Sequence, residues 1–107
     1  MQVIDNRRSH SRVSAIFSVD IAGHGGNFAV DIGTGGVRLV SRQPLLEDEL
    51  ELRLHLDSDM QIVLKGRPVW QQRMSLNGKT MAGISFVHGQ EEAREQLRSW
   101  LESYSMN

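Results

Sequence analysis

The stretch ELELRLHLD, residues 49–57, alternates strictly between leucine and a charged or polar side chain. Successive side chains of a β-strand point to opposite faces, so the leucines share one face and the charged and polar residues share the other. A strand of this kind requires a sheet with one buried and one solvated side, which is typical of antiparallel sheets. The chain is therefore predicted to fold around an antiparallel sheet.

Similar strand patterns recur along most of the chain. Runs rich in β-branched and apolar residues lie at 13–21, 28–32, 37–41, 60–74 and 80–87. The glycine-rich segment AGHGGN, residues 22–27, is expected to break the chain between two strands, and Asn-Gly at 77–78 predicts a hairpin. The long strand 60–74 is expected to bend near Gly66 and Pro68.

The periodicity changes after residue 89. The apolar residues of this last segment fall at helical spacing: Ala93, Leu97, Trp100, Leu101 and Tyr104. Glu91 and Glu92 would occupy the first turn, where the helix dipole favours acids. We therefore expect an all-β fold with a C-terminal helix: a small antiparallel six-stranded β-barrel, with the helix packed against its side or mouth.

Composition limits the class of protein. The chain has 107 residues, enough for one domain with its own core, and no cysteine. Twelve basic and thirteen acidic residues give a net charge of −1, which argues against a nucleic-acid-binding protein with a broad basic face. No apolar run approaches the roughly 20 residues of a membrane span, and residues 1–8 lack the apolar centre of a signal peptide. A cytoplasmic protein is expected.

Residues 30–39, VDIGTGGVRL, place an acid and three glycines between two apolar stretches. Glycine loops of the dinucleotide-binding and P-loop types need a helix directly after them, because the phosphate binds the free N–H groups of that helix. Here a strand pattern follows, so both types are excluded. Two interpretations remain: a turn whose glycines adopt positive φ and let a ligand approach the backbone, or a tight hairpin without a ligand.

A local basic cluster precedes the first strand. Arg7, Arg8 and Arg12 lie within six positions in RRSHSR. A guanidinium group can bind phosphate oxygens, or the O6/N7 edge of guanine, through two parallel hydrogen bonds. On a near-neutral chain, such a cluster suits a small anionic ligand better than a long polyanion, and a solvated basic tail is the alternative. We expect this arginine-rich segment to be flexible, after a loose end at residues 1–6.

Other chemistry has little support. The four histidines lie far apart in the sequence, so no metal site is predicted. The segment SHS, residues 9–11, has no orienting acid nearby, so we predict no catalytic residues and no enzyme activity. Trp70 is interpreted either as a core residue or as an indole face for a ligand. Trp100, on the apolar face of the helix, is expected to be in the core.

The arginine pair, the glycine turn, the barrel strands and the terminal helix, in this order, resemble the PilZ domain family of bacterial receptors for cyclic di-GMP. Arg8 and Arg12 match the family's Arg-x-x-x-Arg. The segment DIGTGG matches its Asp/Asn-x-Ser-x-x-Gly, with Asp31 and Gly36 in place. VW at 69–70 and GISF at 83–86 agree as well. The resemblance covers residues 7–104, which we take as the PilZ domain.

The expected ligand site consists of these residues: Arg7, Arg8, Arg12, Asp31, Gly33, Gly36 and Trp70. The resemblance implies that Arg8 and Arg12 bind phosphates and guanine O6/N7, and that Asp31 accepts hydrogen bonds from guanine N1–H and N2–H. Gly36 would supply the turn. Arg7, directly before the motif, resembles family members that take two intercalated cyclic di-GMP molecules instead of one.

Gly33 stands where the family has serine. Losing one neutral hydrogen bond typically costs about 0.5–1.5 kcal/mol, so binding is expected to be weakened rather than lost. The backbone N–H of Gly33 is expected to keep part of the contact.

We expect cyclic di-GMP to draw the arginine segment across the barrel and so to create a surface for a separate effector protein of motility, pili or exopolysaccharide. The alternative is a PilZ-like interaction module that does not bind nucleotide. A barrel that binds single-stranded nucleic acid would need more aromatic stacking platforms than this sequence offers.

Overall fold

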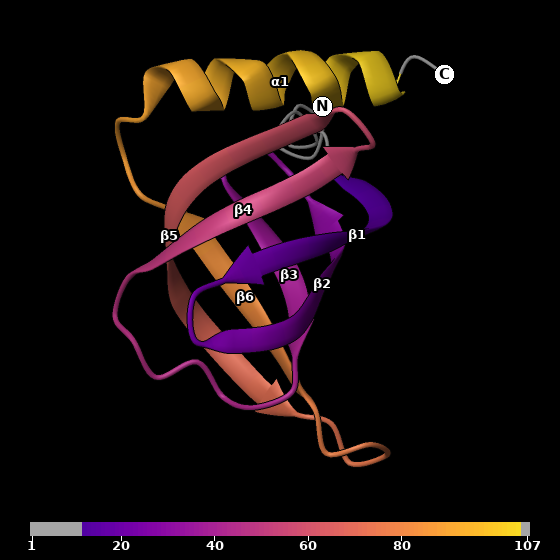
Figure 1. Ribbon diagram of the computed structural model, residues 1–107, viewed down its shortest axis with the longest axis vertical. Helices are drawn as coiled ribbons and strands as arrows, with labels where there is room; N and C mark the ends of the chain where they lie inside the picture. The colour runs from indigo at the N-terminus through magenta and orange to yellow at the C-terminus, as the bar shows by residue number, and fades with distance from the viewer. Residues whose placement is uncertain (1–11, 106–107) are drawn as a thin grey trace, which may run out of the picture.

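The computed structural model describes residues 12–105, which form six strands and one helix. The strands are β1 (Val13–Ile21), β2 (His24–Ile32), β3 (Gly36–Ser41), β4 (Leu50–Asp57), β5 (Met60–Arg73) and β6 (Thr80–Phe86), and the helix is α1 (Glu91–Ser105). The strands form a closed antiparallel barrel in the order β1-β2-β3-β6-β5-β4, and β4 pairs back with β1 (Figure 1). The predicted barrel with a C-terminal helix is confirmed. The predicted loose end 1–6 and most of the predicted flexible arginine segment lie outside the described residues.

The alternating pattern of β4 appears in the barrel as predicted. Leu50, Leu52, Leu54 and Leu56 are buried, and the residues between them face outward. The same rule places Leu39 and Val37 of β3 inside and the residue between them outside. The barrel is therefore filled by aliphatic side chains from every strand, and its outer face is left for polar chemistry.

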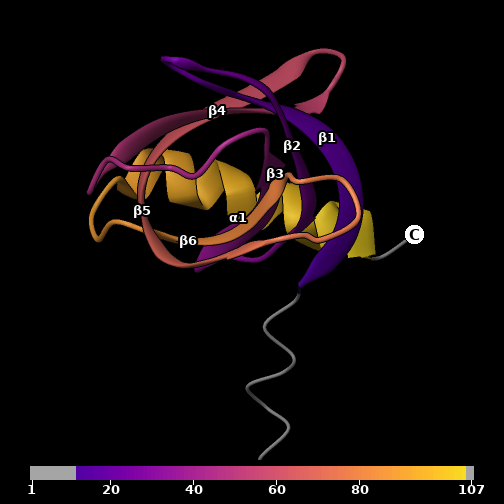
Figure 2. The same ribbon diagram turned by 90° about the horizontal axis from the view of Figure 1, so that it is seen from below.

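Helix α1 lies across one end of the barrel, which it closes (Figures 1 and 2). Leu97, Trp100 and Leu101 are buried against the strands. The Trp100 ring packs edge-on against Phe17 of β1 at 6.4 Å between centroids, and its Nε1–H donates to Asp57 Oδ2 at 3.1 Å. The core position predicted for Trp100 is confirmed. Within residues 12–105, no helix has the length and apolar character needed to cross a bilayer.

The break predicted at residues 22–27 is wrong in extent. Strand β2 already begins at His24, so the turn is confined to Ala22 and Gly23. The glycines at 25 and 26 lie inside the strand, where β2 has one residue more than β1 and Gly26 has φ +73°. A glycine with positive φ is typical of a β-bulge, which interrupts the pairing without ending the strand.

The bend and the hairpin predicted further along the chain are confirmed. Strand β5 curves strongly around the barrel (Figure 1) and has a bulge at Val69, immediately after Pro68. Residues 74–79 connect β5 to β6, with Gly78 at φ +73° and Lys79 N–H donating to Asn77 Oδ1 at 2.9 Å.

The positive φ predicted in one of the two interpretations of the β2–β3 turn is wrong. Among the described residues, positive φ occurs at other glycines but not at 33, 35 or 36. Gly36 is instead needed for space: a Cβ there would lie 2.2 Å from the carbonyl oxygen of Ile84 on β6. The turn is held by the Gly33 N–H, which donates to the Gly36 carbonyl, and by the Phe86 N–H, which donates to the Gly35 carbonyl, both at 2.9 Å. Gly36 thus allows β3 to approach β6 closely.

Adjacent glycines give a direct test of this explanation. Gly36→Ala should lower the free energy of unfolding by about 1–3 kcal/mol, because its methyl group would push β3 away from the β6 backbone. Gly35→Ala, whose Cβ would meet open space, should leave it unchanged or raise it by up to about 1 kcal/mol. Urea denaturation followed by circular dichroism would measure both. Equal losses in the two variants would contradict the close-approach explanation.

Candidate functional site

A row of side chains crosses the outer face of the barrel from β2 to β5. Asp31 of β2 is paired in register with Arg38 of β3, Arg38 with Gly83 of β6, and Gly83 with Trp70 of β5. The pairing brings together residues from four strands. We call these four residues, Asp31, Arg38, Gly83 and Trp70, the surface row.

Bulges help to set the surface row. Between Ala29 and Asp31, β2 has one residue more than β3, and between Pro68 and Trp70, β5 has one residue more than β6. Bulges re-aim the side chains beside them and are over-represented next to functional sites. In this barrel they lie at both ends of the same row.

Asp31 lies between two arginines. One carboxylate oxygen accepts from Arg12 Nη2 at 2.5 Å, and the other lies 2.6 Å from Arg38 Nη2. The Asp31 side chain is 13% exposed, whereas those of Arg12 and Arg38 are 48% and 45% exposed. A mostly buried carboxylate thus holds two half-exposed guanidinium groups at the surface. The cluster carries a formal charge of +1.

Trp70 lies on the surface and not in the core. The residue is 44% exposed, and its indole packs over Gly83. A Cβ on Gly83 would lie 2.3 Å from Trp70 Nε1, so the absence of a side chain at this position makes room for the ring. The indole therefore packs directly on the backbone at Gly83, and Trp70 stays partly accessible.

Three of these side chains, Arg12, Arg38 and Trp70, line a pocket of about 430 Å³, and Asp31 contacts both arginines of this lining. The lining also includes the backbone around Gly36, with Val69 at one side. The volume is within the range of small-molecule sites, roughly 300–1,000 Å³. Two guanidinium groups, one carboxylate and an exposed indole can bind phosphates, the hydrogen-bonding edge of a base, and its flat face. In the described part of the chain, no three His, Asp or Glu side chains converge as metal ligands would.

The structure places the predicted site residues as follows. Arg12 contacts Asp31, Gly36 lines the same pocket, and Trp70 lies across it. Gly33 is buried in the turn, and its N–H already donates to the Gly36 carbonyl. In this structure the N–H is therefore not free for the ligand contact that was predicted for it. Arg7 and Arg8 lie outside the described residues, so their predicted roles stay predictions.

Arg38 and Gly83 were not predicted as site residues. Arg38 stands between two apolar residues of a strand, and this alternation alone predicts an outward side chain. Its proximity to Asp31 depends on the register of β2 against β3, which the sequence pattern does not reveal. Gly83 begins the segment GISF, which agrees with the family, but this segment does not reveal that Gly83 accommodates a side chain from another strand.

Comparisons with known proteins agree with this architecture. The family model described as PilZ domain matches residues 6–103. Among solved structures, the inhibitor of motility MotI/DgrA of Bacillus subtilis is similar, with a TM-score of 0.73 and 16% sequence identity. The match covers 94% of this chain and 52% of that protein, so this chain spans about half of its length. The search of curated proteins found no match.

A family model that covers almost the entire chain, together with the shared barrel fold, decides the classification. The chain belongs to the PilZ domain family, whose members are generally receptors or adaptors for cyclic di-GMP.

Proposed function

We propose that this protein is a cyclic di-GMP receptor that binds its ligand over the surface row. The observation that carries the proposal is the contact of Arg12 with Asp31 beside the exposed indole of Trp70. Arg12 belongs to one family motif and Asp31 to the other, and the fold brings them together at a pocket. Cyclic di-GMP combines two phosphates with two guanines, which matches the mixture of groups in this pocket.

Each group has a physical role in this proposal. Arg12 and Arg38 bind phosphate oxygens or guanine O6/N7 through paired donors. Asp31 accepts from guanine N1–H and N2–H, because a carboxylate has about four lone-pair sites and the two arginine contacts leave capacity for more. Trp70 stacks on a purine, a contact worth about 1–3 kcal/mol per base. Arg7 and Arg8, which precede Arg12 in the sequence, add charge for a second, intercalated ligand.

The ion pairs of the ligand-free site can be exchanged for contacts between the arginines and a ligand. Arg12 and Arg38 are each nearly half exposed, so their pairs with Asp31 contribute little to stability, on the order of 1 kcal/mol or less. A ligand with two phosphates can therefore recruit these arginines at small cost. Asp31 keeps both groups at the pocket until the ligand arrives.

Ligand binding would then order the arginine segment over the pocket and create a surface for an effector protein in the cytoplasm. The similar Bacillus subtilis protein is an inhibitor of motility. By analogy, we propose an effector that controls motility, pili or exopolysaccharide. The protein would act by binding and not by catalysis.

The alternative function is a PilZ module that binds a protein partner without nucleotide. One observation favours it: Gly33 lacks the hydroxyl of the family motif, and its N–H is engaged within the turn. The retained contact between Arg12 and Asp31 favours the receptor instead.

Calorimetric titration with cyclic di-GMP tests the receptor. Arg12→Ala should weaken binding by about 10- to 100-fold, because hydrogen bonds to charged groups contribute roughly 1.5–3 kcal/mol. Arg53→Ala is the matched control, since Arg53 is exposed on β4 and lies outside the pocket. A folded wild-type protein that binds no ligand would refute the receptor, as would equal binding by both variants.

Tryptophan fluorescence tests the stacking role of Trp70. Saturating cyclic di-GMP should quench emission in Trp100→Phe, which keeps Trp70, because a purine would cover the exposed indole. In Trp70→Phe the quenching should be absent, because the remaining Trp100 is buried between helix α1 and the barrel. Quenching that persists in Trp70→Phe would show that the ligand does not stack on Trp70.

The departure from the family motif at position 33 predicts a variant that binds cyclic di-GMP more strongly. Gly33→Ser would restore the motif hydroxyl, and it should strengthen cyclic di-GMP binding by about two- to tenfold. Backbone strain is not expected, since φ at this position is not positive. Calorimetry beside a thermal melt separates affinity from stability. A well-folded variant with unchanged affinity would show that the hydroxyl has no role here.

A further inference from the structure

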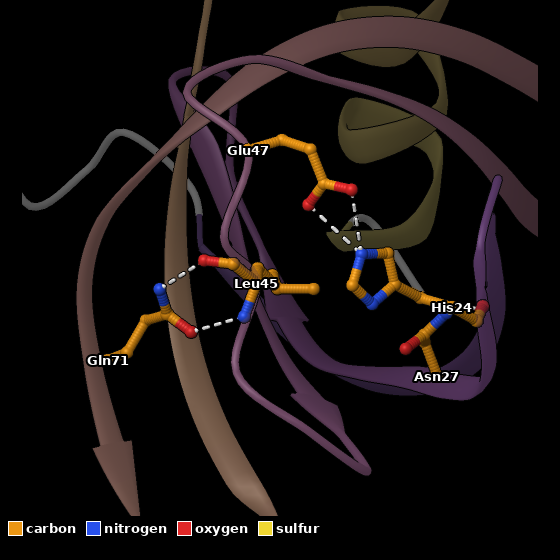
Figure 3. A network of polar contacts seen from close by, with 5 residues as sticks. All are labelled: His24, Asn27, Leu45, Glu47 and Gln71. Carbon is orange, nitrogen blue, oxygen red and sulfur yellow. Dashed lines mark hydrogen bonds and ion pairs between the residues drawn. The ribbon is translucent and has the colours of Figure 1, made fainter.

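The loop between β3 and β4, residues 42–49, is fixed to the barrel at its middle. Gln71 of β5 holds Leu45 through two hydrogen bonds: the Leu45 N–H donates to Gln71 Oε1, and Gln71 Nε2 donates to the Leu45 carbonyl, both at 2.8 Å (Figure 3). The Leu45 side chain is buried in the core. This part of the loop is therefore anchored by both its backbone and its side chain.

A second contact fixes the loop two residues later. His24 of β2 lies with its Nε2 3.0 and 3.1 Å from the two carboxylate oxygens of Glu47 (Figure 3). The pKa of Glu47 is lowered, first by a hydrogen bond from its own backbone N–H and then by the contact with His24. The carboxylate is thus negatively charged at neutral pH.

Leu46 lies between these two anchors and is 85% exposed. An isolated exposed leucine needs no explanation, but this one is held outward by contacts on both sides. It lies beside Pro68 and the bulge residue Val69, which is 63% exposed, at a groove of about 680 Å³. An apolar surface that is both exposed and fixed is suited to binding another molecule.

The charge around this groove indicates what it would bind. Glu47, Asp48 and Glu49 line it, and Arg67 is the basic residue among its lining groups, 3.5 Å from Glu49. The formal charge of these residues is −2. A partner with positive charge would be attracted and oriented here, whereas an acidic one would be repelled.

We propose that this groove is the docking surface for the effector, and that the effector presents a segment with lysine or arginine beside a large apolar side chain. The apolar side chain would pack against Leu46 and Val69, and the basic groups would face the acidic residues of the loop. The assignment to an effector rests on the proposed function, and the docking chemistry rests on the groove itself.

Val69 connects the groove to the candidate ligand pocket, because it lines both. A ligand in the pocket would cover one side of Val69 and add the negative charge of its two phosphates to the pocket next to the groove. The added negative charge would strengthen the attraction for a cationic segment. Cyclic di-GMP is therefore expected to tighten docking without entering the groove.

The test uses a short synthetic peptide with lysines on both sides of a leucine, and a counterpart with glutamates in place of the lysines. NMR titration of the 15N-labelled protein should show saturable shifts in residues 42–49 and around Val69 with the lysine peptide, and these should weaken with added salt. Leu46→Ser should reduce affinity by roughly tenfold, from the lost apolar contact. Leu76→Ser, at a fully exposed leucine on the β5–β6 hairpin, should not.

Charge variants complete the experiment. Asp48→Asn should weaken peptide binding, and Asp59→Asn, in the exposed β4–β5 turn, should leave it unchanged. Equal binding of both peptides, equal effects of Leu46→Ser and Leu76→Ser, or shifts confined to other surfaces would overturn the docking surface.

Calorimetry with cyclic di-GMP on the same samples separates the two proposals. Leu46→Ser should bind the nucleotide as the wild type does. Peptide docking in a protein that binds no nucleotide would support the surface and refute the receptor. Nucleotide binding with no specific peptide docking would refute the surface and support the receptor.

Discussion

The closed barrel requires every strand to divide its side chains between a buried interior and an outer face, and the rest of the molecule depends on this division. Ile32, Leu39 and Ile84 face the core and fix the register of β2, β3 and β6. A shift of one residue would expose them, so the core strongly selects this register. The same register places Asp31 beside Arg38, and Arg38 beside Gly83. The packing of aliphatic side chains inside therefore aligns the polar groups outside.

Local patterns predicted the elements of the fold, because each element leaves a periodic signal in its own residues. The leucine alternation of β4, the Asn-Gly hairpin and the apolar face of α1 are of this kind. The order of strands in the barrel has no such signal, since it depends on contacts between distant segments. The bulge in β2 was not predicted either, because its glycines resemble a chain break in the sequence but lie within a paired strand.

The candidate site was predicted only in part, because some of its residues come together only through contacts between distant segments. The resemblance to PilZ domains identified Arg12 and Asp31, and the structure brings these two together. Arg38 and Gly83 belong to the site through pairing with other strands: no quoted motif contains Arg38, and the GISF segment that begins at Gly83 does not reveal which side chain packs on it. Gly36 was singled out for the freedom of its backbone angles, but a glycine is required there because a Cβ would meet the Ile84 carbonyl across the sheet.

The bulge at Val69 has a consequence for how such a barrel can change over evolutionary time. Pro68 pairs with Ile84 and Trp70 with the adjacent Gly83, so Val69 is an extra residue in a ladder that is continuous on both sides. A deletion of Val69 would leave each remaining residue of β5 on the same face of the sheet as before. Related barrels can therefore acquire or discard an outward side chain here as a change in length, and new partner specificities can arise without any rebuilding of the core.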